Sequence, residues 1–447
     1  MSGNRRLGEL LDEITVGYVG PMVDEYVEDG VPFLRSLNVK PYFVDLDDIR
    51  YITPSFHERI KKSSLRPGDV VAVRTGIPGT SCVIPESLQD ANCSDLVILR
   101  CGAKVDPYYL SYYLNLIAGS HVRNQSVGAI QKHFNIASAK ETPFPQIAIG
   151  EQRKIAAVLS ALEAKIDLNN RINAELEALA KTIYDYWFVQ FDFPDTHGRP
   201  YKSSGGKMVW NDSLNRDIPA RWEARTVGSI ISRAGTGLNP RNNFVLGSGT
   251  NYYVTIKNVT NGRIVLDDKC DKIDDESMAI IDRRSQLRAG DVLFTSIEPI
   301  GVTYLLHEKP TTWNINESVF TIRPDTSVIS PEYLLMLLSS SEMKAFTKNS
   351  SAGSIHKGIR HAVLKSFTLA YAGRKLVDEF SLLLRPMLQK MDNLDKENRE
   401  LARLRDWLLP LLMNGQVRVA GQGRVGWVEA GSVQRIPTSS GELRQEK

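Results

Sequence analysis

The sequence has few cysteines, no long hydrophobic run and no strong excess of charge, and each shortage excludes a class of protein. Its four cysteines form no Cys-x-x-Cys pair, so they suggest neither a disulfide framework nor a zinc site. The longest apolar runs span about six residues, far short of the roughly 20 that cross a bilayer, and no signal-peptide leader is expected. We therefore expect a cytoplasmic protein that does not bind membranes.

Charge and length narrow the choice further. The 447 residues include 55 basic and 52 acidic side chains, which gives a formal net charge of +3. Because the bulk charge is nearly balanced, any surface for nucleic acid must consist of local basic patches. The length exceeds what a single hydrophobic core supports and predicts two or three domains.

The sequence contains an internal repeat, in which one long unit occurs twice. The hexapeptide LRPGDV at residues 65–70 returns as LRAGDV at residues 287–292, which is 222 positions later. The heptapeptide SVGAIQK at residues 126–132 returns as SAGSIHK at residues 351–357, which is 225 positions later. The order is kept and the offset drifts only slightly, so chance does not explain the matches.

Each copy opens with a stretch that mixes short β-rich runs, glycine and proline turns and one apolar helical run. This pattern predicts a mixed α/β domain in each half. We place the first domain at residues 1–150 and the second at residues 216–373, with a linker at residues 191–215. Residues 414–447 contain few large apolar side chains and are expected to form a flexible tail.

A heptad pattern follows each domain, at residues 151–190 and 374–413. Its apolar stripe predicts two long helices that pair with each other as a coiled coil, although each stripe packing on its own domain stays open as an alternative. Two related halves pair through a two-fold axis, so we expect antiparallel helices with the domains at opposite ends. The predicted seam comprises Ile155, Leu159, Leu162, Ile166, Asn173, Leu176, Ile183, Phe380, Leu384, Met391, Leu394, Asn398, Leu401 and Leu408.

Two asparagines and one proline depart from the apolar helical pattern of the two stripes. Asn173 and Asn398 occupy equivalent layers, where a buried amide pair would fix the register of the two helices. Pro386 lacks a backbone N–H, and its ring clashes with the preceding turn of a helix. We therefore expect a kink or a new helix start at Pro386.

Basic residues recur at equivalent positions in the two copies. Repeated positive charge at one structural position is what phosphate contacts require, although a solvated turn is an equally good explanation. Loops with side chains that could read base edges are expected at residues 17–30, 75–81, 235–249 and 296–301. The candidate DNA-binding residues are Lys61, Lys62, Arg66, Lys132, Arg283, Arg284, Arg288, His356, Lys357 and Arg360.

Catalytic motifs are missing from the sequence. The segment Asp106-Pro107-Tyr108 comes nearest to the Asn/Asp-Pro-Pro-aromatic turn of adenine methyltransferases, but it lacks one proline. No G-x-x-x-x-G-K-[ST] phosphate loop is present, and the seven histidines show no ligand spacing. We therefore expect no catalytic residue, no metal and no cofactor in this chain.

Two segments resemble a known family. The segment WFVQFDFPDTHGRPYKSSGGKMVW at residues 187–210 is similar to the central segment of the specificity subunits of type I restriction-modification systems. The motif PFP at residues 143–145, followed by EQ at residues 151–152, resembles that family's passage from a target recognition domain into a spacer helix. The resemblance covers roughly residues 5 to 413, but the second copy has FTLAY at residues 367–371 and no Glu-Gln pair.

This resemblance implies a non-catalytic DNA-binding subunit with two α/β target recognition domains on an antiparallel coiled coil. In the family, each domain reads one half of an asymmetric, split DNA sequence, and the helices set the length of the unread gap. Two modification subunits, which methylate adenine, would dock along the helices, and ATP-dependent restriction subunits would join that complex. The rival interpretation is a scaffold whose two modules bind proteins and not DNA.

Overall fold

The chain forms two compact units in the computed structural model, residues 1–170 with 395–447 (unit 1) and residues 171–394 (unit 2). None of the helices in the described part of the chain has the length and hydropathy of a bilayer-crossing segment. The structure describes residues 4–123, 133–260, 262–267, 269–351, 358–420, 424–429 and 432–435.

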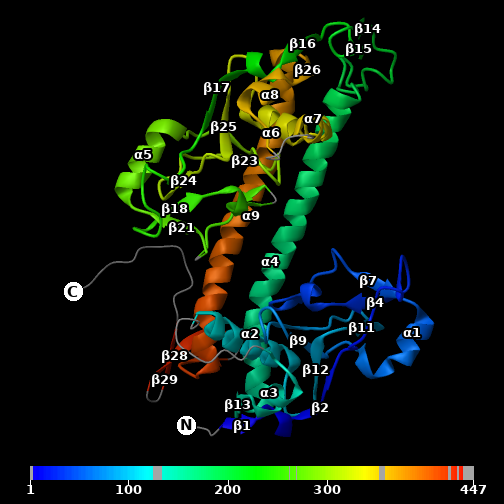
Figure 1. Cartoon of the computed structure of the whole chain (residues 1–447), viewed down its shortest axis with the longest axis vertical. Helices are drawn as coiled ribbons and strands as arrows, with labels where there is room; N and C mark the ends of the chain where they lie inside the picture. Colours follow the sequence, from blue (N-terminus) through cyan, green and yellow to red (C-terminus); the bar gives the residue numbers. More distant parts are fainter. Residues whose placement is uncertain are drawn as a thin grey trace. The chain divides into compact units, whose positions relative to one another are not determined.

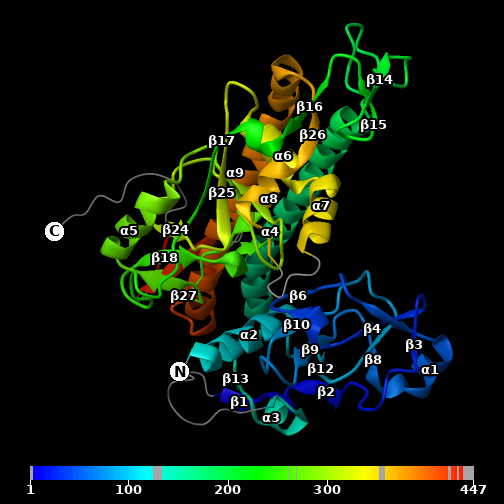
Figure 2. The same cartoon turned by 45° about the horizontal axis from the view of Figure 1, so that its top comes forward.

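Unit 1 is built on a four-stranded antiparallel sheet in the order β10-β9-β12-β2 (Figures 1 and 2). The strands are β2 (Leu11–Val16), β9 (Val70–Val73), β10 (Ser81–Val83) and β12 (Leu96–Cys101). Helix α2 (Pro107–Arg123) packs on β9 and β10. The first four residues of β12 and all of β9 are buried, so these central strands are continuous apolar runs and not alternating ones.

Shorter elements complete unit 1. A second sheet, in the order β3-β7-β4-β11-β8, contains both parallel and antiparallel pairs. These elements are β1 (Asn4–Arg6), η1 (Leu7–Glu9), β3 (Tyr26–Val27), β4 (Val31–Leu34), η2 (Ser36–Asn38), β5 (Val39–Lys40), β6 (Phe43–Val44), β7 (Arg50–Ile52), α1 (Pro54–Arg59), η3 (Lys61–Ser63), β8 (Ser64–Leu65), β11 (Ala91–Cys93), α3 (Ile136–Glu141) and β13 (Pro143–Pro145).

Unit 2 repeats the architecture of unit 1. Its four-stranded sheet has the order β23-β22-β25-β17, which matches the first sheet strand for strand. The strands are β17 (Ile231–Thr236), β22 (Val292–Thr295), β23 (Thr303–Leu305) and β25 (Val319–Pro324). The other elements are β14 (Met208–Asn211), β15 (Arg216–Pro219), β16 (Glu223–Thr226), η5 (Val227–Ser229), β18 (Asn251–Val254), η6 (Ile256–Asn258), β19 (Val259–Thr260), β20 (Arg263–Ile264), β21 (Asp271–Ile273), α5 (Asp275–Ser285), β24 (Trp313–Ile315), α6 (Pro331–Ser339), α7 (Ser341–Ser351), α8 (His361–Ser366) and β26 (Thr368–Tyr371).

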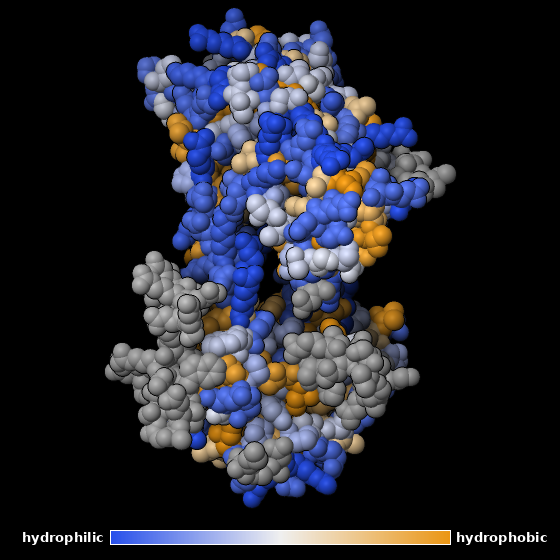
Figure 3. Space-filling view, turned by 90° about the vertical axis from the view of Figure 1, so that its left-hand side faces the viewer, coloured by the Kyte–Doolittle hydropathy of each residue, from blue (hydrophilic) through white to orange (hydrophobic). Residues whose placement is uncertain are grey.

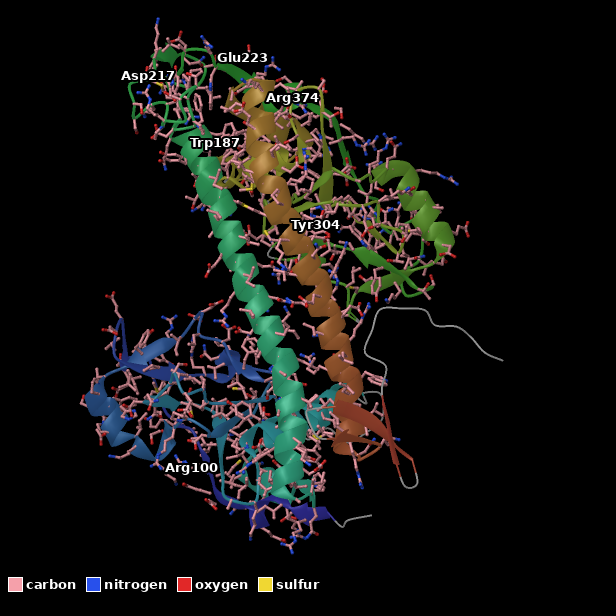
Figure 4. The ribbon with its side chains drawn as sticks, turned by 180° about the vertical axis from the view of Figure 1, so that it is seen from behind. Arg100, Trp187, Asp217, Glu223, Tyr304 and Arg374 are labelled. Carbon is pink, nitrogen blue, oxygen red and sulfur yellow. The ribbon has the colours of Figure 1, made fainter. Side chains whose placement is uncertain are left out.

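The repeated Gly-Asp-Val motif has a structural explanation. Asp69 and Asp291 are buried, and each accepts a hydrogen bond from the backbone N–H three residues earlier. The guanidinium of Arg323 donates to Asp291 from Nε at 2.7 Å, and that of Arg100, labelled in Figure 4, lies 3.5 Å from Asp69. A buried carboxylate needs both hydrogen bonds and a counter-charge, so the motif fixes the start of the central strand in each unit.

The two predicted helices are present as α4 (Ile149–Tyr184), which ends in a π-helical turn (Asp185–Val189), and α9 (Arg374–Met413). Within each unit the two helices lie alongside each other (Figures 1 and 2). In unit 1, Arg405 donates to Glu163 at 2.7 Å, and Asn169 donates to Asn398 at 2.9 Å. The partner's number falls as the α4 number rises, so the helices are antiparallel, as predicted.

All fourteen predicted seam residues are buried or partly buried. The expected amide pair of Asn173 with Asn398 stays a prediction, because the two residues belong to different units. Asn398 bonds to Asn169 and also donates to Asn170 at 3.0 Å, whereas Asn173 belongs to unit 2. Asn173 and Asn398 are equivalent by the repeat, and the antiparallel contacts inside unit 1 join Asn398 to Asn169.

Of the two outcomes expected at Pro386, a new helix start is wrong, because α9 continues through this residue. Proline frees the carbonyl four residues earlier, which is that of Leu382. Both Pro386 and Leu382 are exposed, so water can satisfy this carbonyl and the helix tolerates the proline.

Inside unit 1, Arg405 of α9 joins this helix to Tyr42 and to Glu163 of α4. Arg405 packs over the ring of Tyr42, with 5.0 Å between its Cζ atom and the ring centroid, while it bonds to Glu163. Burial raises the pKa of Tyr42 to about 12, so this hydroxyl stays protonated at neutral pH. Burial alone would lower the pKa of Arg405, but its hydrogen bond and charge pairing with Glu163 raise the pKa above its ordinary value. The group therefore stays charged beside the ring.

The prediction of a flexible tail from residue 414 is wrong for the part that the structure describes. Strands β27 (Val417–Ala420), β28 (Arg424–Glu429) and β29 (Ser432–Arg435) form an antiparallel sheet. Val417 and Val419 are buried in the core of unit 1 together with Leu408 and Leu412 of α9. The apolar residues of this segment alternate in a strand pattern, which a count of large side chains overlooked.

We therefore expect Val417→Ala to lower the free energy of unfolding by about 2 kcal/mol, because two buried methyl groups are lost. Urea unfolding followed by circular dichroism measures this loss. Arg418→Ala, at the exposed neighbouring position, is the matched control and should change little. If both substitutions change the free energy of unfolding equally, the burial of Val417 is contradicted and a flexible tail is supported.

Candidate nucleic-acid interface

Two candidate loops of unit 1 leave its four-stranded sheet at the same end. Strands β2 and β9 both run antiparallel to β12. Their last residues, Val16 and Val73, pair with Val97 and Leu96 at the start of β12. The loop after β2 and the loop after β9 therefore emerge side by side, with the start of β12 between them.

A third segment reaches this end of the sheet. The backbone N–H of Phe134 donates to the carbonyl of Arg74 at 3.0 Å. Phe134, which follows the repeated Gly-x-Ile-x-Lys segment in the sequence, therefore lies beside the loop after β9. We call this part of unit 1, made of residues 17–30, 74–80 and 133–134, its loop end.

Unit 2 has the same construction. Thr236 at the end of β17 pairs with Phe320, and Thr295 at the end of β22 pairs with Val319. The backbone N–H of Ile359 donates to the carbonyl of Ser296 at 2.8 Å, as Phe134 does to Arg74 in unit 1. The loop end of unit 2 consists of residues 237–250, 296–301 and 358–361.

Polar and basic groups gather at the loop end of unit 2. Arg360 is exposed, and Nε of Arg284 donates to the carbonyl of Gly237 at 3.0 Å. His361 places Nε2 3.1 Å from the carbonyl of Gly235, and burial lowers the pKa of His361 below its ordinary value. The imidazole is therefore neutral at pH 7, and the two arginines supply the positive charge.

At the loop end of unit 1, the positive charge of Arg74 is paired with a carboxylate. Its Nη1 donates to Asp95 at 2.8 Å, and Thr75 donates to the same carboxylate at 3.3 Å. The equivalent contact in unit 2 involves no charged side chain, because Ser296 donates to the carbonyl of Ser318 at 2.8 Å. The two loop ends therefore share a backbone framework and differ in their charges.

The structure does not bring all predicted DNA-binding residues to the loop ends. Arg66 and Arg288 lie in the turns before β9 and β22, at the opposite ends of these strands from the loops. Lys61 and Lys62 are exposed on η3, and Lys61 lies 3.1 Å from Glu58. Arg283 is exposed in the last turn of α5. Lys132, His356 and Lys357 lie outside the described residues.

Sequence reasoning concentrated on charge and missed another property of the loop ends. Exposed β-branched aliphatic side chains occur in all four candidate loops. They are Val19, Val23, Ile77, Val245 and Ile297. The signal was present in the sequence as single aliphatic residues within loops rich in glycine, proline and polar residues.

The helices also carry exposed apolar residues. On the face drawn in Figure 3, hydrophilic residues predominate and hydrophobic ones form small separate patches. Leu179 of α4 and Leu404 of α9 are both exposed, and they lie 225 positions apart, at equivalent places in the repeat.

In the described residues no group of three or more His, Cys, Asp or Glu side chains is arranged to hold a metal ion.

Comparisons with known proteins agree with this architecture. A family model described as the type I restriction modification DNA specificity domain matches residues 52–178. The MjaIX specificity subunit of Methanocaldococcus jannaschii is 23% identical over 394 residues, which cover 84% of this chain and 85% of that protein. The EcoBI specificity subunit of Escherichia coli is 24% identical over 422 residues, which cover 85% of this chain and 86% of that protein.

A solved structure shows the same fold. The crystal structure of the type I restriction-modification S subunit from M. genitalium superposes with a TM-score of 0.54 at 14% identity. The match covers 92% of this chain and 95% of that one. The matched family model and the near full-length relatives show that this chain is similar to type I restriction-modification specificity subunits, and the solved structure shows that it shares their fold.

Proposed function

We propose that each α/β domain reads one half of an asymmetric, bipartite DNA sequence with its loop end. The observation that carries this proposal is the duplication of the loop end itself. Three segments meet at the same end of the same sheet in both units, while their sequences differ. One framework with two sets of side chains is suited to a target whose two halves differ in base sequence.

The paired helices set the length of the unread gap, and two modification subunits dock along them. Leu179 and Leu404 support two docking positions, because equivalent exposed leucines on related helices offer the same contact twice. Single exposed leucines are common on protein surfaces, so the argument rests on their equivalence and not on their exposure.

Chemistry belongs to the partners in this proposal. The modification subunits methylate adenine, and ATP-dependent restriction subunits that join the complex cleave DNA. The chain contributes recognition without catalysis, and it does so in the cytoplasm, where its four free cysteines stay reduced. The comparisons give no support to the rival interpretation of a protein-binding scaffold.

The test is the affinity of the assembled complex for duplex DNA as a function of salt. Several phosphate contacts predict a steep, linear fall of log affinity with log salt concentration. Arg360→Ala should weaken binding to all sequences alike and lower the slope by about 1, because one phosphate contact is lost. Lys375→Ala, an exposed substitution on α9, is the control. Binding that is indifferent to salt would contradict DNA recognition.

A further inference from the structure

Ile77 and Ile297 stand out among the exposed aliphatic residues of the loop ends. Each belongs to the hairpin loop that follows the central strand of its unit, β9 in one case and β22 in the other. They are 50% and 37% exposed, although a β-branched aliphatic side chain gains nothing from water. The two loops otherwise differ, with the sequences TGIPG at residues 75–79 and SIEPIG at residues 296–301.

The backbone holds both isoleucines on equivalent, anchored hairpins. In unit 1 the N–H of Gly79 donates to the carbonyl of Val73 at 2.9 Å, and in unit 2 the N–H of Gly301 donates to that of Thr295 at 2.9 Å. Ile297 also forms a backbone bridge with Gly358. An anchored loop loses little conformational entropy when it binds, so its tip is suited to a specific contact.

The chemistry of the side chain limits what it can recognise. Isoleucine has neither a donor nor an acceptor, so it cannot read the hydrogen-bonding pattern of a base edge. The apolar group that a base presents in the major groove is the C5 methyl group of thymine. Arg360 and Arg284 lie at the same loop end as Ile297, where they can contact the phosphates beside such a base.

We propose that Ile77 and Ile297 each contact the methyl group of one thymine, one in each half of the target sequence. This inference rests on the proposed function and specifies how part of each half-site is read. It assigns thymine specificity to two residues that carry no charge, while the basic residues contribute to affinity for all sequences.

The experiment uses the complex with its modification subunits and the target duplex found by mapping the methylated adenines. Each thymine of the two half-sites is replaced in turn by uracil, which removes only the methyl group. For the wild-type complex we expect an affinity loss of about fourfold at one thymine of each half-site, the value for one buried methyl group.

Variants then connect each thymine with its isoleucine. Ile77→Ala should abolish the uracil effect in one half-site and keep it in the other, and Ile297→Ala should do the reverse. Leu46→Ala and Val265→Ala serve as controls, because both residues are 44% exposed and lie outside the loop ends. Both control variants should keep the uracil effects of the wild type.

The outcomes separate this inference from the proposed function. A complex without sequence preference for any duplex would contradict the function itself. Specific binding that no uracil substitution weakens, or a uracil effect that persists in both isoleucine variants, would overturn the inference and leave the function intact. If the isoleucine variants respond to uracil as the wild type does but bend the DNA less, the isoleucines act as apolar wedges between base steps. That result also overturns the inference.

Discussion

A heptad added to both helices is expected to lengthen the unread gap of the target by roughly three base pairs and to leave both half-sequences unchanged. Seven helical residues add roughly 10 Å at 1.5 Å per residue, and one base pair occupies about 3.4 Å of duplex. The half-sequences should persist because reading resides in the loop ends and not in the helices.

The boundary between the units provides the insertion points. One heptad, a copy of residues 164–170, follows Asn170 in α4, and another, a copy of residues 395–401, precedes Asp395 in α9. Both points lie between the units, so the contacts inside each unit are kept, including the pairs of Glu163 with Arg405 and Asn169 with Asn398. The duplicated segments repeat the asparagine pair in register.

Sequencing of methylated adenines in DNA modified by the complex measures the gap directly. Insertion into α4 alone is the control, and it should reduce modification because it sets the helices out of register. An unchanged gap would contradict the role of the helices as a ruler, and a change of base identity in either half would locate part of the reading outside the loop ends.

Phe380→Ala is expected to lower the free energy of unfolding of unit 2 by about 3–5 kcal/mol, the usual cost of removing a fully buried aromatic ring. Phe380 is fully buried, and its ring lies 4.9 Å from that of Phe188 and 5.7 Å from that of Trp187, measured between centroids. Figure 4 shows Trp187 at the end of α4, beside α9. The cluster therefore joins both helices, and its loss leaves a cavity between them.

Urea unfolding followed by tryptophan fluorescence reports on this cluster, because Trp187 and Trp222 belong to the same core. Leu382→Ala is the matched control, since Leu382 lies on the same helix but is 66% exposed. We expect a change of less than about 0.5 kcal/mol for the control. A loss below about 1 kcal/mol for Phe380→Ala would mean that the cluster can relax around the cavity.

Patterns repeated along the chain predicted most of the architecture. The duplicated LRPGDV and LRAGDV motifs predicted two related domains, and the heptad stripe predicted α4 and α9. The antiparallel direction was predicted from the symmetry expected of two related halves. The helices could be predicted because a periodic pattern of burial is a local property of the sequence, and the two domains because the repeat can be read directly from it. The limits proposed for the domains, 1–150 and 216–373, stay predictions.

Features that depend on three-dimensional pairing were harder to predict. Inside unit 1, Asn398 bonds to Asn169 and Asn170, and equivalence by sequence offset does not reveal these partners. Arg66 is close in sequence to the loop after β9, yet β9 itself separates them. The tail was misjudged because its valines are small, although Val417 and Val419 complete a core.

The composition of unit 1 also determines the order in which the protein can fold during synthesis. Leu159 from α4 shares a core with Leu408 and Leu412 from the end of α9 and with Val417. Domains made first usually fold first, but this core must wait for residues translated last. Unit 2 ends at Leu394, so all of its residues are translated before the segment that completes the core of unit 1.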